Sequence, residues 1–328
     1  MTDPILEVRD LEISFFSGKK RTPRTDGVRF SLYPGEILCL VGESGCGKSV
    51  TALSILGLLG DAGRITGGEI LFDGQDLVRL PEKELDRVRG NEISMIFQDI
   101  MYSMNPVFRI GDQLTEGMRK HLHMARPEAE KRAVELLLKT GIREPEKAMR
   151  AYPHQLSGGM RQRAMIAMAV ACRPRILIAD EPTTALDATI QLQIMALLRR
   201  LRDEENTAVL LITHDIGVVA EMADRVVVMY AGQCVEDGTA ESVLTAPRHP
   251  YTRALMRAVP TLNMDRSERL YSIPGQVPED YHALSGCRFR DRCPNGQRCA
   301  GKPVWLDLGD GHRAYCAPDL ADGRDQDG

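Results

Sequence analysis

Residues 42–49 read GESGCGKS, a glycine-rich stretch whose residue types could bind a phosphate chain. Glycines allow a tight backbone path, so the N–H groups of the loop can converge on phosphate oxygens. Lys48 would reach the outer phosphates as a point charge, and Ser49 would offer its hydroxyl to Mg²⁺. We therefore predict that nucleoside triphosphate is bound by Gly42, Glu43, Ser44, Gly45, Cys46, Gly47, Lys48, Ser49 and Val50.

The elements on either side of this phosphate loop must hold it in place. The apolar run at 35–41 predicts a strand, and the apolar spacing at 49–56 predicts a helix. Strand, glycine loop and helix is the arrangement in which a helix N-terminus faces an anion. A chance glycine turn is the alternative, and the flanking elements argue against it.

A pair of carboxylates follows a second apolar run. Residues 176–179 read ILIA, and such continuous apolar character is typical of a buried parallel strand. The strand would deliver Asp180 and Glu181 to the carboxyl end of the sheet, where ligands bind in α/β folds. Asp180 would hold the Mg²⁺ shell, and Glu181 would polarise an attacking water as general base. A solvated acidic turn is the alternative.

Three further motifs occur in a characteristic order: LSGGMRQR at 156–163, ILIADEPTTALD at 176–187 and LLITHD at 210–215. With the phosphate loop, they make the chain resemble the ATP-binding subunit of an ABC transporter from about Leu6 to Val259. The resemblance implies an α/β ATPase core with a helical subdomain. It also implies that Ser157, Gly158 and Gly159, at a helix N-terminus with a serine cap, bind the γ-phosphate held by a second subunit.

The same resemblance implies roles for four isolated residues. Gln98 matches the residue that touches Mg²⁺ or water, and His214 matches the histidine that contacts the γ-phosphate. Phe15 corresponds to the aromatic that stacks on adenine, although the adjacent Phe16 is an alternative. Asp187 corresponds to the residue that communicates across the pair of nucleotide domains.

Composition and hydropathy argue against a nucleic-acid-binding protein and against a membrane-spanning one. The net charge is −4, so there is no overall basic field for nucleic acid. No apolar run approaches the ~20 residues needed to span a bilayer, and the N-terminus does not read as a signal peptide. We expect a peripheral protein at the cytoplasmic face of the plasma membrane. Soluble ABC proteins that act on DNA or ribosomes are the alternative class, but they carry two nucleotide domains or long insertions.

The C-terminal part narrows the family. Residues 249–255 read HPYTRAL. Two further motifs lie at or near Gln98, namely FQD at 97–99 and SMNP at 103–106. These segments resemble the importers of the oligopeptide, dipeptide and nickel group. We therefore expect a nucleotide-binding domain at 1–247, with its helical subdomain at about 99–165, and an extension at 248–328. The expected function is ATP hydrolysis that powers peptide import, with a second ATPase subunit, two membrane permeases and an extracytoplasmic binding protein as partners.

Eight cysteines fall into two groups. Four cluster in the extension with C-x5-C-x5-C-x16-C spacing, namely Cys287, Cys293, Cys299 and Cys316. Clustering in a cytoplasmic chain suggests metal, but the spacing lacks the C-x2-C pairs usual for zinc. The family resemblance implies a [4Fe–4S] cluster, offset by Arg288, Arg290, Arg292 and Arg298, while zinc and free thiols stay open. A fifth cysteine, Cys46, lies beside Lys48 and a helix N-terminus, which predicts a lowered pKa and a reactive thiol.

Overall fold

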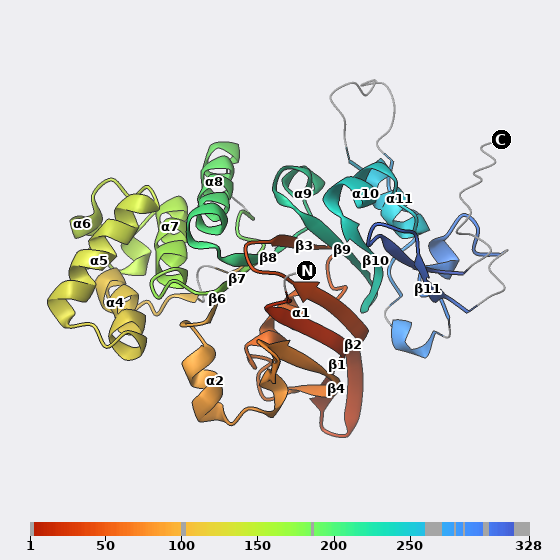
Figure 1. Cartoon of the computed structure of the whole chain (residues 1–328), viewed down its shortest axis with the longest axis horizontal. Coiled ribbons are helices and arrows are strands. Elements are labelled where there is room, and N and C mark those ends of the chain that lie inside the picture. Colours follow the sequence, from red (N-terminus) through yellow and green to blue (C-terminus); the bar gives the residue numbers. More distant parts are fainter. Residues whose placement is uncertain are drawn as a thin grey trace. The chain divides into compact units, whose positions relative to one another are not determined.

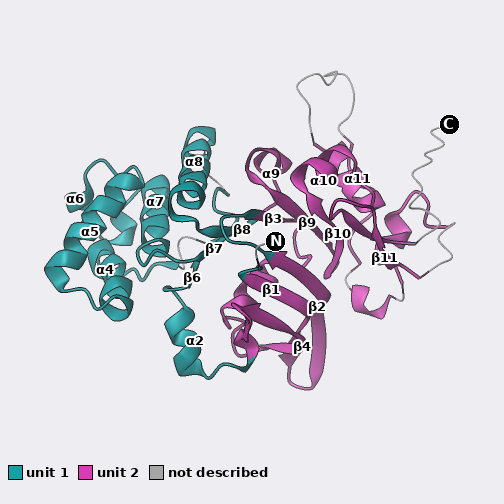
Figure 2. Cartoon of the chain, in the orientation of Figure 1, with its two compact units in different colours: residues 1–5, 32–37, 79–212 teal, residues 6–31, 38–78, 213–328 magenta. Residues whose placement is uncertain are grey.

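The computed structural model describes residues 3–99, 103–184, 187–259, 271–278, 280–284, 286–297 and 302–317. They divide into two compact units (Figure 2). Unit 1 holds residues 1–5, 32–37 and 79–212, and unit 2 holds residues 6–31, 38–78 and 213–328. Cys299 and Arg298 lie outside the described residues.

Unit 1 combines a parallel sheet with a group of helices (Figure 1). Its strands β6 (Ile93–Ile96), β7 (Ile176–Asp180) and β8 (Ala208–Thr213) pair in parallel, with β7 in the middle. Every residue of the three strands is buried, as expected for a sheet covered on both faces. The helices are α2 (Glu82–Val88), α4 (Ile110–His121), α5 (Arg126–Lys139), α6 (Pro145–Arg150), α7 (Gly158–Ala169) and α8 (Ala188–Glu205).

Four helices, α4 to α7, lie between β6 and β7 in the chain and pack on one another. Helix α4 contacts α5, α6 and α7. Helix α5 begins with Pro127 in its first turn and buries Ala129, Ala133 and Leu137, which lie four residues apart on one face. A proline at the start and an apolar stripe at this spacing are what the sequence predicts for this stretch.

Unit 2 contains two sheets. In the first, β2 (Lys20–Leu32), β1 (Leu6–Ser17), β4 (Gly63–Phe72) and β5 (Gln75–Asp76) lie in that order, and β1 runs antiparallel to β4. In the second, β3 (Ile37–Val41) pairs in parallel with β9 (Arg225–Tyr230). Strand β10 (Gln233–Thr239) continues it antiparallel to β9. The helices are α1 (Lys48–Ile55), α9 (Ile216–Met222), α10 (Ala240–Thr245) and α11 (Pro250–Arg257).

The C-terminal segment, residues 248–317 as far as they are described, extends the second sheet. Strand β12 (Arg313–Cys316) pairs antiparallel with β10, and β11 (Val304–Asp307) pairs with β12. Helix α11 and the short turns around 281–292 belong to the same unit as the phosphate loop. The segment packs on the end of β9, since the buried rings of Tyr251 and Phe289 both contact the ring of Tyr230.

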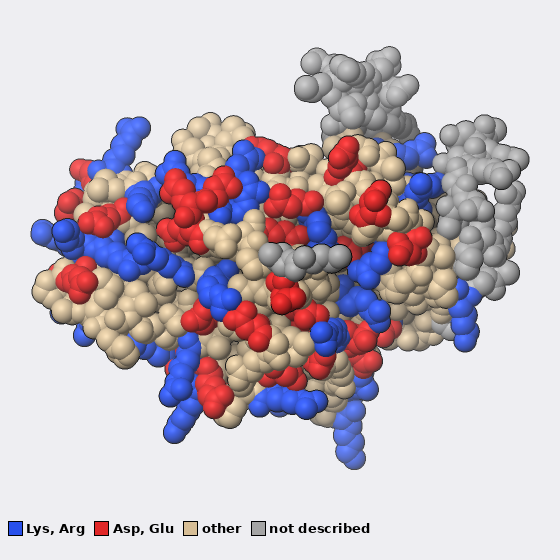
Figure 3. Space-filling view, in the orientation of Figure 1, with Lys and Arg blue, Asp and Glu red and all other residues tan. Residues whose placement is uncertain are grey.

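Surface charge is mixed in sign. On the face drawn in Figure 3, acidic and basic side chains are interspersed, with no broad field of one sign. Among the described residues, no helix is long and apolar enough to cross a membrane.

Candidate functional site

The carboxylate pair predicted at the end of β7 lies in unit 1. Asp180 is the last residue of the strand and is 3% exposed. Glu181 follows with a φ of 46°, in the left-handed region that non-glycine residues rarely adopt. Its backbone N–H donates to the carbonyl of Ile212 on β8 at 2.9 Å, so the neighbouring strand holds the turn. Strain of this kind at a predicted general base is typical of functional positions.

Glu181 is oriented by two side chains. The Gln98 amide Nε2 donates to Glu181 Oε2 at 2.9 Å, and the Thr184 hydroxyl donates to the same oxygen at 2.9 Å. The structure thus brings together Gln98 and Glu181, which are 83 residues apart in the chain. Thr184 was not among the residues predicted from sequence. The sequence offered a signal for it, because Thr184 is the second threonine of DEPTT at 180–184, three residues after Glu181.

The signature residues open helix α7, also in unit 1. Ser157 is the N-cap, and its hydroxyl accepts from the Met160 N–H at 3.3 Å. A Cβ added to Gly158 would meet nothing within 4 Å. Asp187 is the N-cap of α8 and accepts from the Ile190 N–H at 3.0 Å. Both residues are therefore helix caps, and the contacts predicted for them across a subunit pair stay predictions.

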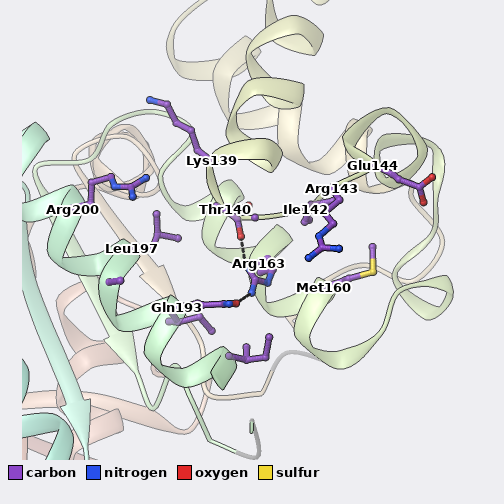
Figure 4. Close-up of a pocket in the computed structure, with 14 residues that line it drawn as sticks. Lys139, Thr140, Ile142, Arg143, Glu144, Met160, Arg163, Gln193, Leu197 and Arg200 are labelled. Atoms are coloured by element: carbon purple, nitrogen blue, oxygen red, sulfur yellow. Dashed lines mark hydrogen bonds between the residues drawn. The ribbon is translucent and has the colours of Figure 1, made fainter. Parts of the chain in front are cut away.

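A cavity of about 700 Å³ adjoins the signature helix (Figure 4). Arg163, within the signature stretch, crosses it: one nitrogen donates to the carbonyl of Thr140 at 2.6 Å and another to Gln193. Arg163 thereby ties α7 to the end of α5 and to α8. Since none of the predicted nucleotide ligands lines this cavity, we assign it a structural role.

The phosphate loop lies in unit 2, between β3 and α1 as predicted. Gly42 and Gly47 have φ angles of 152° and 106°. A Cβ on Gly42 would lie 2.1 Å from the Met229 carbonyl oxygen, so no other residue fits there. Lys48 is buried, and its Nζ donates to the carbonyls of Gly42 and Glu43 at 2.7 and 3.0 Å. The lysine is therefore held across the loop that it is predicted to serve.

The remaining predicted residues of unit 2 occupy separate places. Phe15 is half-buried on β1 opposite Gly63 of β4, whereas Phe16 is 38% exposed. His214 is exposed and directly follows β8. The adenine and γ-phosphate roles of these residues stay predictions.

The predicted reactivity of Cys46 is wrong. Its side chain is 1% exposed, and burial raises the pKa of the thiol although Lys48, with Nζ 3.7 Å from Sγ, opposes that rise. Burial penalises the thiolate more than the lysine and the helix N-terminus favour it. We therefore expect a buried thiol that reacts slowly.

Three of the four cysteines predicted to hold a cluster, Cys287, Cys293 and Cys316, are described, and Cys299 is not. Cys287 and Cys293 line one cavity of about 640 Å³, but Cys316 is not part of its lining. Among the described residues, no group of three or more His, Cys, Asp or Glu side chains could hold a metal ion.

Two of the arginines near the cysteines, Arg288 and Arg292, form ion pairs with carboxylates elsewhere in unit 2. Arg288 pairs with Asp26 at 2.5 Å and donates to the carbonyl of Ala231 at 2.6 Å. Arg292 binds the carboxylate of Glu43 with both terminal nitrogens, at 2.9 and 3.1 Å. Sequence reasoning did not identify Arg292 as a contact of the phosphate loop, because 249 residues separate the two partners.

Comparisons with known proteins identify the family. Residues 25–184 match the ABC transporter family model, and residues 235–299 match the model of the oligopeptide/dipeptide transporter C-terminal region. A probable peptide ABC transporter ATP-binding protein of Sinorhizobium fredii is 51% identical over 96% of this chain and 95% of that protein. The dipeptide transport ATP-binding protein DppD of Escherichia coli is 48% identical over 97% of this chain and 98% of that protein.

Solved structures show the same fold. The dimeric structure of MJ0796, a bacterial ABC transporter cassette, is 30% identical, with a TM-score of 0.65. It matches over 72% of this chain and 98% of that one. A second structure of that cassette, in a post-hydrolysis state with ADP and Pi, matches equally well. The chain belongs to the ATP-binding proteins of the ABC transporter family, and it is an ATPase of that type.

Proposed function

We propose that this chain is the ATPase subunit that powers the import of peptides through membrane permeases. The observation that carries the proposal is its similarity, over nearly the whole length, to proteins named for peptide and dipeptide transport. The match to the oligopeptide/dipeptide C-terminal region supports the same substrate class. An action on nucleic acid or ribosomes is not favoured, since the net charge is −4.

The proposed reaction assigns one task to each group. The phosphate loop and Lys48 bind the triphosphate of ATP, and Glu181 takes a proton from the attacking water. Gln98 and Thr184 orient the Glu181 carboxylate through its Oε2 atom. His214 contacts the γ-phosphate. The contacts at Glu181 support its part of this division, and the parts of the phosphate loop and His214 rest on the family motifs and on the chemistry of their side chains.

Mg²⁺ is the proposed metal, and each unit offers oxygen donors of the type that suits it. The Ser49 hydroxyl, the Asp180 carboxylate and the Gln98 amide oxygen are hard oxygen donors of the kind that Mg²⁺ prefers. The Gln98 nitrogen donates to Glu181, which supports an acceptor role for its amide oxygen toward the metal or water. A bound Mg²⁺ would neutralise charge on the phosphates.

The proposed assembly is a pair of ATPase subunits on two permeases, with an extracytoplasmic binding protein. The signature residues Ser157, Gly158 and Gly159 would complete the site of the second subunit, which is either the same chain or a related one. This places the chain at the cytoplasmic face of the plasma membrane. The domain boundary at residue 247 is part of the same proposal.

The general-base role is tested with Glu181→Gln. Since the substitution removes the proton acceptor but keeps the shape, turnover should fall by roughly 10²–10⁴-fold. The dissociation constant for ATP should stay within about twofold of the original, because Glu181 is not a phosphate ligand. Near-normal turnover in this variant would show that the base is another group.

The transport role is tested in proteoliposomes that hold the co-purified membrane partners. Labelled dipeptide should accumulate with ATP and the original chain, and not with Glu181→Gln. A nickel chelate offered under the same conditions serves as the competing cargo. Uptake of the chelate without the peptide would overturn the substrate class and leave the ATPase role intact.

The [4Fe–4S] hypothesis enters no step of this mechanism. Iron, acid-labile sulfide and zinc measured in anaerobically purified protein decide among a cluster, a zinc site and free thiols. Near-stoichiometric iron and sulfide would support the cluster, and one tightly bound zinc would support the second alternative.

A further inference from the structure

We propose that Arg292 and Tyr251 of the C-terminal segment are positioning residues that set the affinity of the phosphate loop for nucleotide. Both act on Glu43, the second residue of the loop. The inference rests on nucleotide binding by this loop, and it adds a regulatory role for a segment that lies beyond the ATPase motifs. All of the contacts that carry it lie within unit 2.

Three groups of Glu43 are engaged at once. Its backbone N–H donates to the Tyr251 hydroxyl at 2.8 Å. Its carboxylate receives both terminal nitrogens of Arg292. Its carbonyl accepts from Lys48 Nζ at 3.0 Å. The C-terminal segment therefore holds the N–H and the carboxylate of Glu43, while the carbonyl of the same residue contacts Lys48.

The two positioning residues are themselves held by aromatic packing. Tyr251 is fully buried, and its ring lies 4.7 Å from the ring of Tyr230 and 5.4 Å from that of Phe289. The Arg292 guanidinium lies over Tyr230 and Phe289, at 5.7 and 5.8 Å from the ring centroids. It also donates to the Tyr230 hydroxyl at 3.3 Å and to the Pro274 carbonyl at 2.8 Å.

Burial makes the ion pair sensitive to the loss of either partner. The side chain of Arg292 is 7% exposed and that of Glu43 is 25% exposed. A bidentate pair with little solvent around it is strong and directional. Removing the arginine would leave a poorly solvated carboxylate in a loop that must accept a polyphosphate. The unpaired charge would repel the nucleotide. Glu43 would also no longer be held in place, so its carbonyl would hold Lys48 less firmly.

The C-terminal segment is also joined to the sheet that supports the phosphate loop. Strand β12 pairs with β10, and the Gly232 N–H, in the turn between β9 and β10, donates to the Cys46 carbonyl at 3.0 Å. A change that displaces Arg292 or Tyr251 would therefore reach the phosphate loop through Glu43.

The experiment compares four variants of the full chain by the dissociation constant for a fluorescent ADP analogue. Arg292→Ala should weaken binding on the order of tenfold, with a matching rise in KM for ATP and a kcat within about twofold. Tyr251→Phe removes one acceptor oxygen and should weaken binding about threefold. Arg313→Ala is the matched control, because Arg313 is in the same segment but pairs with Asp237 on β10. It should bind as the original chain does.

The decisive variant is the double substitution Arg292→Ala with Glu43→Gln. If the arginine acts by neutralising Glu43, removing that charge should restore most of the lost affinity. A merely structural role for Arg292 would give no such rescue. Limited proteolysis checks that each variant is folded, and Tyr251→Phe serves if Arg292→Ala does not fold.

Two outcomes would overturn the inference. One is an unchanged dissociation constant in folded Arg292→Ala or in Tyr251→Phe. The other is a loss in Arg313→Ala as large as that in Arg292→Ala. Loss of binding in Lys48→Ala, with no effect in Arg292→Ala, would reject this inference alone and leave ATP binding by the loop in place.

Discussion

The two helix N-termini of the ATP motifs are built in opposite ways. Helix α1 has Gly47 as its N-cap and no side-chain cap, and the loop before it is held by distant residues of unit 2. Helix α7 has Ser157 as its N-cap, and this serine caps the helix from within the motif. The phosphate loop is thus pre-organised by tertiary contacts, whereas the signature depends on local chemistry and leaves the surface around Gly158 open.

This difference matches the roles proposed for the two motifs. A loop that wraps a phosphate chain must keep several N–H groups convergent, so rigid support improves its affinity. A motif that meets the nucleotide of another subunit needs an accessible helix end. The contrast also predicts different consequences for substitutions at the two places.

The largest effect is expected at the phosphate loop. Lys48→Ala removes the cation that faces the phosphates, and nucleotide binding should weaken by roughly 100-fold. The matched variant in the signature is Gly158→Asp, which places a negative charge at an open helix N-terminus. It should leave ADP binding unchanged and abolish ATP-driven dimerisation, as followed by size-exclusion chromatography. Equal loss of ADP binding in both variants would break the comparison.

A pH-dependent effect is expected at one of the residues that support the phosphate loop. Burial lowers the pKa of His249 from 6.5 to about 4, and its Nδ1 accepts from the Tyr251 N–H at 3.1 Å. The folded imidazole stays neutral, while the unfolded one takes up a proton below its ordinary pKa. Stability contributed by His249 is therefore present above pH 6.5 and is lost as the pH falls toward 4. Between pH 7 and pH 5 the loss should be about 2 kcal/mol.

Urea unfolding at the two pH values measures this loss. The variant His249→Asn keeps an acceptor at the helix cap without the titration, so its stability should change less with pH. An identical pH dependence in the variant and the original chain would assign the effect to another group.

The smallest effect is expected at the signature cap. Ser157→Ala removes one capping hydrogen bond and should cost about 1 kcal/mol of stability. Thr239→Ala, at the N-cap of α10 and outside the ATP motifs, is the matched control with a similar expected cost. The two variants should differ only in ATPase activity, which falls for Ser157→Ala. Equal activities would show that the signature serine acts as a cap and nothing more.

Much of this protein follows from the sequence because its signals are local. The phosphate loop, the buried strand before Asp180 and the serine-capped helix at 157 each depend on residues within a few positions of one another. Backbone conformation and helix capping are set at that range, so motif and spacing were sufficient. The family membership, which the comparisons confirm, was predicted from the same short motifs.

The tertiary structure decided what lies far apart in the chain. Gln98 and Thr184 meet on one oxygen of Glu181, and Arg292 reaches Glu43 across 249 positions. Burial raised the pKa of Cys46 although its sequence neighbours predicted the reverse. Ion pairing and desolvation depend on which surfaces the fold brings together, and this could not be predicted from residue types and spacing.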